Sequence, residues 1–166
     1  MGKIKEAVFD AGPFIHLSEI NQLELIKLFS TILTTSYILE ECKHLRKEII
    51  KFKHIQEAIL KSTANDFVKY LVNRYNIDFG EATGISLCKQ ERIKLFFTDD
   101  LEARDVAYNL GFEAHGTISI ILRTYKENII SKKETIELIE KLYKGSSLYL
   151  SKDLKDWIIN EIGNFK

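Results

Sequence analysis

The sequence predicts an α/β fold: a mostly parallel, twisted central sheet of four to five short strands, flanked by helices and followed by a helical C-terminal tail. Three observations predict it. Short apolar or β-branched runs alternate with helical patterns along the 166 residues, as is typical of parallel sheets with helices on both faces. Acidic residues directly follow two of these runs, where sites form in such sheets. Helical periodicity dominates the C-terminal part.

The predicted strands are short and end at turn or cap residues. Residues 7–9 form an apolar run that ends at Asp10, and residues 31–35 are rich in β-branched side chains, which favour strands. The remaining predicted strands are residues 94–98, 112–115 and 146–150.

The predicted helices are identified by their spacing and by their end residues. Pro13 suits the first turn of a helix, where its missing N–H costs nothing. Ser36 is expected to cap the next long helix, and Gly111 to end another in the C′ position. Residues 67–75 are ambiguous between helix and strand, and we favour helix. The other expected helices cover residues 23–29, 36–45, 48–60, 78–90, 101–110, 135–143 and 154–162, with one more starting at 116–117.

Composition limits the class of protein. The apolar fraction of 45% and the charged fraction of 29% are those of a soluble globular protein. No apolar run approaches the ~20 residues of a membrane span, and the N-terminus lacks a secretory signal pattern. We therefore expect a cytoplasmic protein with no membrane partner. We interpret residues 1–166 as one domain, with a catalytic core over 1–128 and a helical extension over 129–166. Cys42 and Cys88 are too few for a disulfide framework or a zinc site, and we interpret both as buried or semi-buried thiols.

Four acidic clusters carry the functional signal. Two of them, Asp10 and the Asp99–Asp100 pair, follow predicted strands, and two lie in helical stretches, at 40–41 and at Glu81. A fold that gathers these carboxylates creates a like-charge repulsion that a cation must offset, and hard divalent cations such as Mg²⁺ prefer oxygen ligands. The pattern predicts metal-dependent chemistry.

Each acid also has a purely structural explanation. Asp10 could cap the helix that begins near Pro13. Asp78 and Glu81 have the spacing of a capping box, and Asp99 with Glu102 repeats that spacing. The adjacent glutamates at 40–41 could be solvated surface residues. The coincidence of four clusters favours the metal hypothesis over these separate explanations.

The basic residues leave alternatives open. Arg104 orients a metal-site carboxylate, contacts a phosphate, or forms a helical salt bridge with Asp99 or Asp100, on the order of 0.3 kcal/mol. The net charge is zero, so composition does not indicate a nucleic-acid binder. The basic stretch 43–61 is either a solvated helix face or a phosphate-contacting face.

Taken in order, these segments resemble the PIN-domain ribonucleases. Residues 8–17, VFDAGPFIHL, resemble the family's opening motif. Residues 38–42, ILEEC, resemble a helical segment whose second glutamate belongs to the metal site, which points to Glu41. Residues 78–82, DFGEA, are similar to the Gly-Glu-Ala helix start of an archaeal and bacterial, toxin-like subgroup. Residues 97–104, FTDDLEAR, are similar to its Asp-Asp-x-x-Ala-Arg signature.

The resemblance implies a PIN-like three-layer sandwich and a Mg²⁺- or Mn²⁺-dependent endoribonuclease whose products carry a 5′-phosphate and a 3′-hydroxyl. The implied catalytic residues are Asp10, Glu41, Glu81, Asp99 and Asp100. The implied metal ligands are Asp10, Glu41, Glu81 and Asp100, and Asp99 is either an acid beside the ligands or an alternative ligand. Thr98 and Arg104 are the implied supporting residues.

The resemblance also suggests partners. Many relatives are toxins of toxin–antitoxin pairs and work as homodimers, so RNA, a second copy of the chain and a separate antitoxin are the expected partners. One alternative is a PIN-like RNA-binding or assembly module without turnover. Another is a phosphotransfer or phosphatase domain, which usually needs a second acid near the first-strand aspartate, where this chain has Ala11 and Gly12.

Overall fold

The computed structural model describes residues 4–164, and its centre is a five-stranded sheet with the order β3-β2-β1-β4-β5. Every strand pairing in it is parallel. The strands are β1 (Ile4–Phe9), β2 (Phe29–Thr34), β3 (Ile55–Glu57), β4 (Leu95–Phe97) and β5 (Glu113–His115). The predicted α/β class and its mostly parallel sheet are confirmed.

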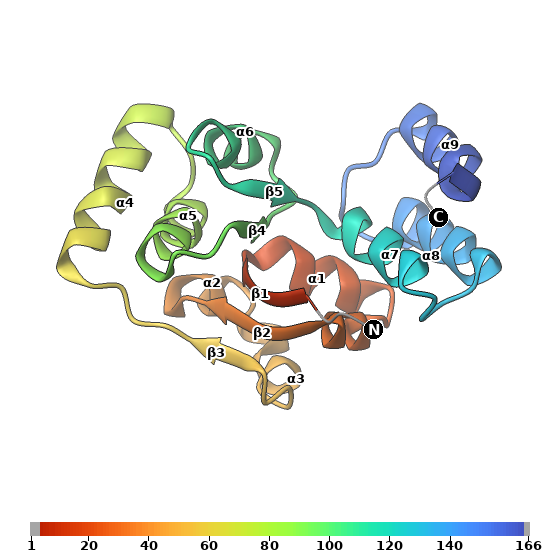
Figure 1. Cartoon of the computed structure of the whole chain (residues 1–166), viewed down its shortest axis with the longest axis horizontal. Helices are drawn as coiled ribbons and strands as arrows, with labels where there is room; N and C mark the ends of the chain where they lie inside the picture. The colour runs from red at the N-terminus through yellow and green to blue at the C-terminus, as the bar shows by residue number, and fades with distance from the viewer. Residues whose placement is uncertain (1–3, 165–166) are drawn as a thin grey trace.

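Helices cover both faces of this sheet (Figure 1). They are α1 (Ala11–Glu19), η1 (Leu23–Leu28), α2 (Ser36–Glu41), η2 (Lys43–Leu45), α3 (Arg46–Ile49), α4 (Ser62–Tyr75), α5 (Phe79–Glu91), α6 (Leu101–Asn109), α7 (Thr117–Lys126), α8 (Lys132–Gly145), α9 (Lys152–Glu161) and η3 (Ile162–Asn164). Val8 and Phe96 pack against α4, α5 and α6, whereas Phe9 and Phe97 pack against α1, η1 and α7. Successive strand residues thus serve opposite faces, and the three-layer sandwich is confirmed.

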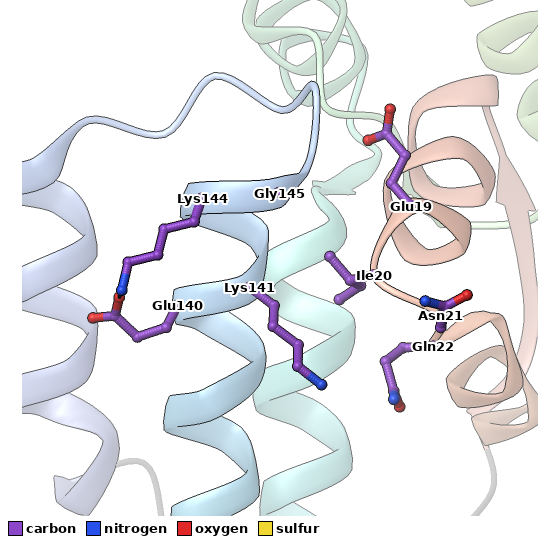
Figure 2. Close-up of a pocket in the computed structure, with 8 residues that line it drawn as sticks. All are labelled: Glu19, Ile20, Asn21, Gln22, Glu140, Lys141, Lys144 and Gly145. Carbon is purple, nitrogen blue, oxygen red and sulfur yellow. Dashed lines mark ion pairs between the residues drawn. The ribbon is translucent and has the colours of Figure 1, made fainter.

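The C-terminal helices extend the layer that contains α7. Figure 1 shows α8 and α9 beside α7, on the side of the molecule away from α4. Leu138, Leu142 and Ile158 join the same hydrophobic cluster as Phe9. A cleft of about 440 Å³ lies between α8 and the loop that follows α1 (Figure 2). The proposed division of the chain at residue 128 stays a prediction.

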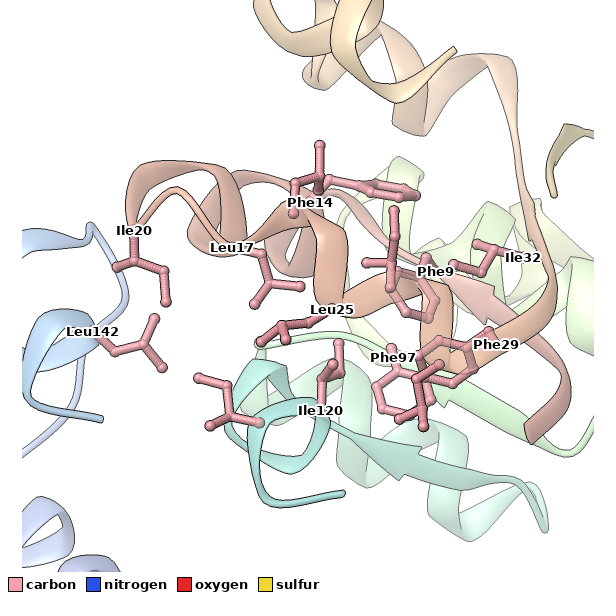
Figure 3. Close-up of a cluster of buried hydrophobic side chains, with 14 of the residues drawn as sticks. Phe9, Phe14, Leu17, Ile20, Leu25, Phe29, Ile32, Phe97, Ile120 and Leu142 are labelled. Atoms are coloured by element: carbon pink, nitrogen blue, oxygen red, sulfur yellow. The ribbon is translucent and has the colours of Figure 1, made fainter. Parts of the chain in front are cut away.

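Four phenylalanines fix the strand ends that precede the acids (Figure 3). The Phe9 ring centroid lies 5.0 Å from those of Phe29 and Phe97 and 5.3 Å from that of Phe14. Such tilted and edge-to-face contacts add to the burial of large apolar surfaces. Because Phe9 precedes Asp10 and Phe97 precedes Thr98, the cluster anchors the backbone from which the acidic residues project.

Two predicted elements are wrong. Residues 48–60 are not one helix, because α3 ends at Ile49 and residues 55–57 form the edge strand β3, paired with β2. The pairing of this short segment with the sheet overrides its helical periodicity. Residues 146–150 are not a strand, because Ser146 ends α8 with its hydroxyl donating to Leu142 O at 2.6 Å, and the segment leads into α9.

Smaller expectations are mostly confirmed. The helix over 67–75 is present within α4. The cap of α2 is Thr35 rather than the predicted Ser36, because the Thr35 hydroxyl accepts a hydrogen bond from Ile38 N. Cys42 and Cys88 are both buried, and burial raises the pKa of Cys42 to about 12. Among residues 4–164, no helix is long and apolar enough to cross a membrane.

The packing of α5 on the sheet predicts the effect of one substitution. A Cβ on Gly84 would lie 2.6 Å from Phe96 Cε2, and Phe96 is fully buried. Alanine gains up to about 1 kcal/mol over glycine in a helix, but overpacking a close-packed core costs roughly 1–3 kcal/mol. We therefore expect Gly84→Ala to lower the free energy of unfolding, measured by urea denaturation.

The matched control is Gly145→Ala, where nothing lies within 4 Å of the added carbon. We expect that variant to be neutral or slightly stabilised. Equal stability of the two variants would contradict the described contact between α5 and β4.

Candidate functional site

Three of the acids lie at the carboxyl edge of the sheet, as expected from parallel strands. Asp10 directly follows β1, and Asp99 and Asp100 follow β4 after Thr98. The two strands are neighbours, and their ends are aligned, because Asp10 N donates to Phe97 O at 2.9 Å. The sheet thus brings together acids that are about ninety residues apart in the chain.

The Thr98 hydroxyl connects two of these acids. It donates to Asp10 Oδ2 at 2.8 Å and accepts from Asp100 N at 3.3 Å. Thr98 is fully buried and Asp10 is 6% exposed. Asp10 occupies the N-cap position of α1, but its side chain makes no capping hydrogen bond, so the helix-cap explanation for this acid is wrong. Its other oxygen, Oδ1, is buried and has no hydrogen-bond partner among the described residues.

Two helices bring the glutamates to the same edge. Glu41 is the last residue of α2, and a Cβ on Gly80 would lie 2.0 Å from its Oε1. Only glycine leaves room for that carboxylate against the start of α5. Glu81 lies next to Gly80 and closes the predicted capping box, with its Oε2 accepting from Asp78 N at 3.0 Å. Glu40 instead lies 3.6 Å from exposed Lys43 in an ion pair, so the geometry distinguishes the adjacent glutamates.

The pKa values show that these carboxylates are electrostatically coupled. Burial, with repulsion from Asp99 and Asp100, raises the pKa of Asp10 to about 6, although the Thr98 hydroxyl and the Ala11 amide partly offset it. Burial also raises the pKa of Glu81 to about 7, with repulsion from Asp100 and Asp10. These acids therefore bear an unfavourable concentration of negative charge at neutral pH.

The pKa of Glu41 follows the same trend. It is raised by burial and by repulsion from Asp10 and Asp78. Glu41 is thereby coupled to the first-strand aspartate although it lies on a different element. A cation placed among these groups would relieve the penalty of every one of them.

Asp99 has a different environment from its neighbour Asp100. Its Oδ1 accepts from Thr117 N at 2.7 Å, and its Oδ2 lies 2.5 Å from Thr117 Oγ1 and 2.7 Å from His16 Nδ1. Burial alone would raise the pKa of Asp99, but these partners outweigh it and lower the pKa. Since a carboxylate only accepts, His16 is assigned its proton on Nδ1. Asp99 therefore joins β4 to α1 and to the start of α7.

Asp100 is the N-cap of α6, with its Oδ1 accepting from Ala103 N at 2.8 Å. The prediction that Asp99 caps this helix is wrong, because Asp99 is turned toward α7. Arg104 forms no salt bridge with Asp99 or Asp100 within residues 4–164, and its Nε is buried without a partner among those residues. Among the roles considered for Arg104 from the sequence, the helical salt bridge is therefore wrong.

The acids are close but do not form a closed ligand set. In the part of the chain that the structure describes, no three Asp, Glu, His or Cys side chains are placed to share one metal ion. Glu81 and Asp100 each use one oxygen to accept a backbone N–H at the start of a helix. The chemistry of the donors nevertheless fits Mg²⁺ or Mn²⁺, which take oxygen ligands. Asp10 Oδ1 is the clearest free donor.

Sequence reasoning missed residues that shape the site. His16 and Thr117 bond to Asp99, and Gly116 makes room for it, because a Cβ there would lie 2.6 Å from Asp99 Oδ1. His16 and Gly116 belong to segments with recognisable motifs, but no spacing rule connects them to Asp99 across the chain. Gly80 belongs to the Gly-Glu-Ala motif, but the motif predicts only a helix start there and not the room that this glycine leaves for Glu41.

The cleft between α1 and α8 is not a second candidate site. Glu140 on its wall pairs with Lys144 at 3.1 Å (Figure 2). Glu140 also pairs with Lys155 at 3.0 Å. Glu19 accepts from Ser147 N at 2.8 Å. Glu140 is thus paired with cationic side chains and Glu19 is hydrogen-bonded, so neither carboxylate bears the repulsion found at the sheet edge.

The raised pKa of Asp10 predicts a stability change with pH. Its carboxyl binds a proton more tightly in the folded state, so the folded state is penalised as pH rises from about 4 to about 7. At about 1.4 kcal/mol per pKa unit, the full penalty is on the order of 3 kcal/mol. We expect Asp10→Asn to be more stable than the wild type at pH 7.5 in a metal chelator and equally stable at pH 4, by urea denaturation.

The neighbouring acid supplies the control. The pKa of Asp99 is lowered, so Asp99 stabilises the fold above its ordinary titration range and Asp99→Asn should destabilise the protein at pH 7.5. If both variants shifted stability in the same direction at pH 7.5, the contrast described between the two carboxylates would be incorrect.

A comparison with known proteins supports what the fold and the acids indicate. A family model described as a PIN domain matches residues 6–164, nearly the whole chain. No curated protein and no solved structure matches this chain significantly. The match includes every acidic residue discussed above and both layers of helices. The chain belongs to the PIN-domain family.

Proposed function

We propose that this chain is a metal-dependent endoribonuclease that hydrolyses RNA phosphodiester bonds with Mg²⁺ or Mn²⁺. PIN domains are generally nucleases, and this supports a hydrolase in general. The observation that carries the finer proposal is the buried, unpartnered oxygen of Asp10 among carboxylates of raised pKa. A site with this electrostatic penalty is suited to binding a divalent cation.

Each acid has a separate task in this proposal. Asp10 holds the ion through Oδ1, while Thr98 fixes its Oδ2. Asp100 contributes the oxygen that does not cap α6, and Glu81 the one that does not cap α5. Glu41 approaches from α2. The bound ion would supply a water of lowered pKa and stabilise charge on the phosphate oxygens.

Asp99 acts as a positioning residue in this proposal. Both of its oxygens are already hydrogen-bonded to α7 or to His16. It holds the end of β4 and therefore the backbone of Asp100. Arg104, whose Nε is buried and unpartnered among the described residues, is a cationic group near this edge, because its Nη1 lies 3.7 Å from the position of a Cβ on Gly116, and we propose that it contacts a phosphate.

The biological setting is part of the same proposal. We propose a cytoplasmic toxin that works as a homodimer and is held by a separate antitoxin. This rests on the resemblance of the motifs at 78–82 and 97–104 to toxin-like relatives.

A second candidate function has one observation in its favour. The absence of three acids sharing an ion within residues 4–164 favours a PIN-like RNA-binding or assembly module with weak catalysis. In that case the helix caps of Glu81 and Asp100 are permanent. Metal binding measured separately from cleavage distinguishes the two functions.

The first test is cleavage of single-stranded RNA with Mn²⁺. We expect products with a 5′-phosphate and a 3′-hydroxyl, and a loss of at least about 100-fold in rate for Asp10→Asn and Glu41→Gln, because each removes a charge from the ion's surroundings. The rate is read from a labelled oligonucleotide on a denaturing gel.

Glu40→Gln is the matched control, since Glu40 pairs with exposed Lys43, and it should keep the wild-type rate. Undiminished Mn²⁺-dependent cleavage by Asp10→Asn would refute the assignment of the site.

The second test is thermal stabilisation by Mn²⁺ at pH 7.5. At about 100 times its dissociation constant, a ligand adds about 2.7 kcal/mol, or roughly 5–10 °C in melting temperature for a chain of this size. Asp10→Asn should lose most of this shift, as read by scanning fluorimetry. A full shift in melting temperature without any RNA cleavage would favour the binding module. No shift in the wild type would show that the site does not bind the metal.

A further inference from the structure

Two exposed aromatic rings lie beside the acids and belong to neither hydrophobic cluster. Tyr37 is 52% exposed and Phe79 is 43% exposed. Their ring centroids are 4.7 Å apart, with an interplanar angle of 67°. An edge-to-face pair leaves ring surface open to solvent, and burial in the core does not account for it.

The position of the pair is defined by its neighbours. Tyr37 and Glu41 are four residues apart on α2, so their side chains lie on the same helix face. Phe79 is the first residue of α5 and adjoins Gly80, where Glu41 Oε1 lies. Hydroxyls of Thr35 and Thr83 lie 2.9 Å apart and join the two helices. The rings are therefore a fixed part of the rim of the carboxylate site.

The chemistry of the rim differs from that of the site beneath it. The acids repel a polyanion until cations neutralise them, so a rim contact that does not depend on phosphate charge would add to substrate binding there. Exposed aromatic rings bind nucleobases by stacking, with little preference for sequence. Bases of a duplex are already stacked and paired, whereas those of unpaired strands can be turned onto a protein ring.

We propose that Tyr37 and Phe79 form a stacking site for an unpaired nucleobase next to the phosphate that occupies the acidic site. This inference rests on the proposed nuclease function and deepens it. It makes the two rings substrate-binding residues that hold a base of the single-stranded RNA beside the acids. The preference it creates is for unpaired structure rather than for sequence.

Binding is measured separately from cleavage by using the Asp10→Asn protein, both without and with Mn²⁺ in the buffer. The RNA contains the fluorescent base 2-aminopurine. Stacking on a ring changes the fluorescence of this base. We expect Phe79→Ala and Tyr37→Ala, each added to Asp10→Asn, to weaken binding of unpaired RNA by roughly 5- to 150-fold. Phe79→Trp should retain binding, and Phe79→Leu should not, because leucine keeps apolar bulk without a ring face.

The control is Tyr149→Ala, since Tyr149 is 91% exposed and lies in the connection between α8 and α9. It should leave affinity unchanged. In the cleaving protein, the ring variants should raise KM for unpaired RNA and leave the slow cleavage of a duplex unaltered.

The outcomes separate the two proposals. If the otherwise unaltered chain cleaves no RNA with Mn²⁺, the nuclease function fails, whatever the rings do. If it cleaves unpaired and duplex RNA equally, and both ring variants keep its KM, the stacking site fails while the nuclease stands. If the ring variants instead change the mass of the protein measured by light scattering and keep its RNA affinity, the rings form an interface between copies of the chain. That result would overturn the proposal.

Discussion

Burial of the Asp10 carboxylate at the end of β1 is the constraint on which the rest of the site depends. The phenylalanine cluster fixes the strand end beneath it, and Thr98 holds one of its oxygens. The second oxygen is left without a partner in the described structure. Burying an acid in this way costs free energy that a merely structural residue would avoid, since a neutral side chain would pack there without the penalty. The remaining acids increase that cost by repulsion, which favours a cationic ligand.

Asp99 and Asp100 show how two adjacent identical side chains acquire different roles. Neighbouring residues after a strand project in different directions. Asp99 reaches the amide and hydroxyl of Thr117 and the ring of His16, and its pKa falls. Asp100 begins α6 and raises the pKa of Asp10 and Glu81 by its charge. Both acids repel Asp10, but Asp99 also stabilises the fold around the site through its hydrogen bonds, whereas Asp100 adds to the repulsion on Glu81 as well.

Much of this arrangement could be predicted from the sequence, for identifiable reasons. The alternation of strand and helix patterns predicts the parallel sheet, and the acids that directly follow strands predict the edge at which they meet. Prediction failed where tertiary contacts decided the outcome. Residues 55–57 form an edge strand because they pair with β2. Asp99 does not cap α6 because its carboxylate accepts hydrogen bonds from Thr117, eighteen residues later in the chain. The Tyr37–Phe79 pair has no sequence signal either, since only the approach of α2 to α5 brings the rings together.

The most direct test of the account is a titration of the Asp10 carboxyl by ¹³C NMR, in a chelator and then with Mg²⁺, which is diamagnetic. The account predicts a pKa of about 6 without metal and a value displaced well below its ordinary range once Mg²⁺ is present, because the cation stabilises the ionised form. An ordinary pKa near 3.8 that does not respond to Mg²⁺ would contradict both the electrostatic penalty and its relief by a cation.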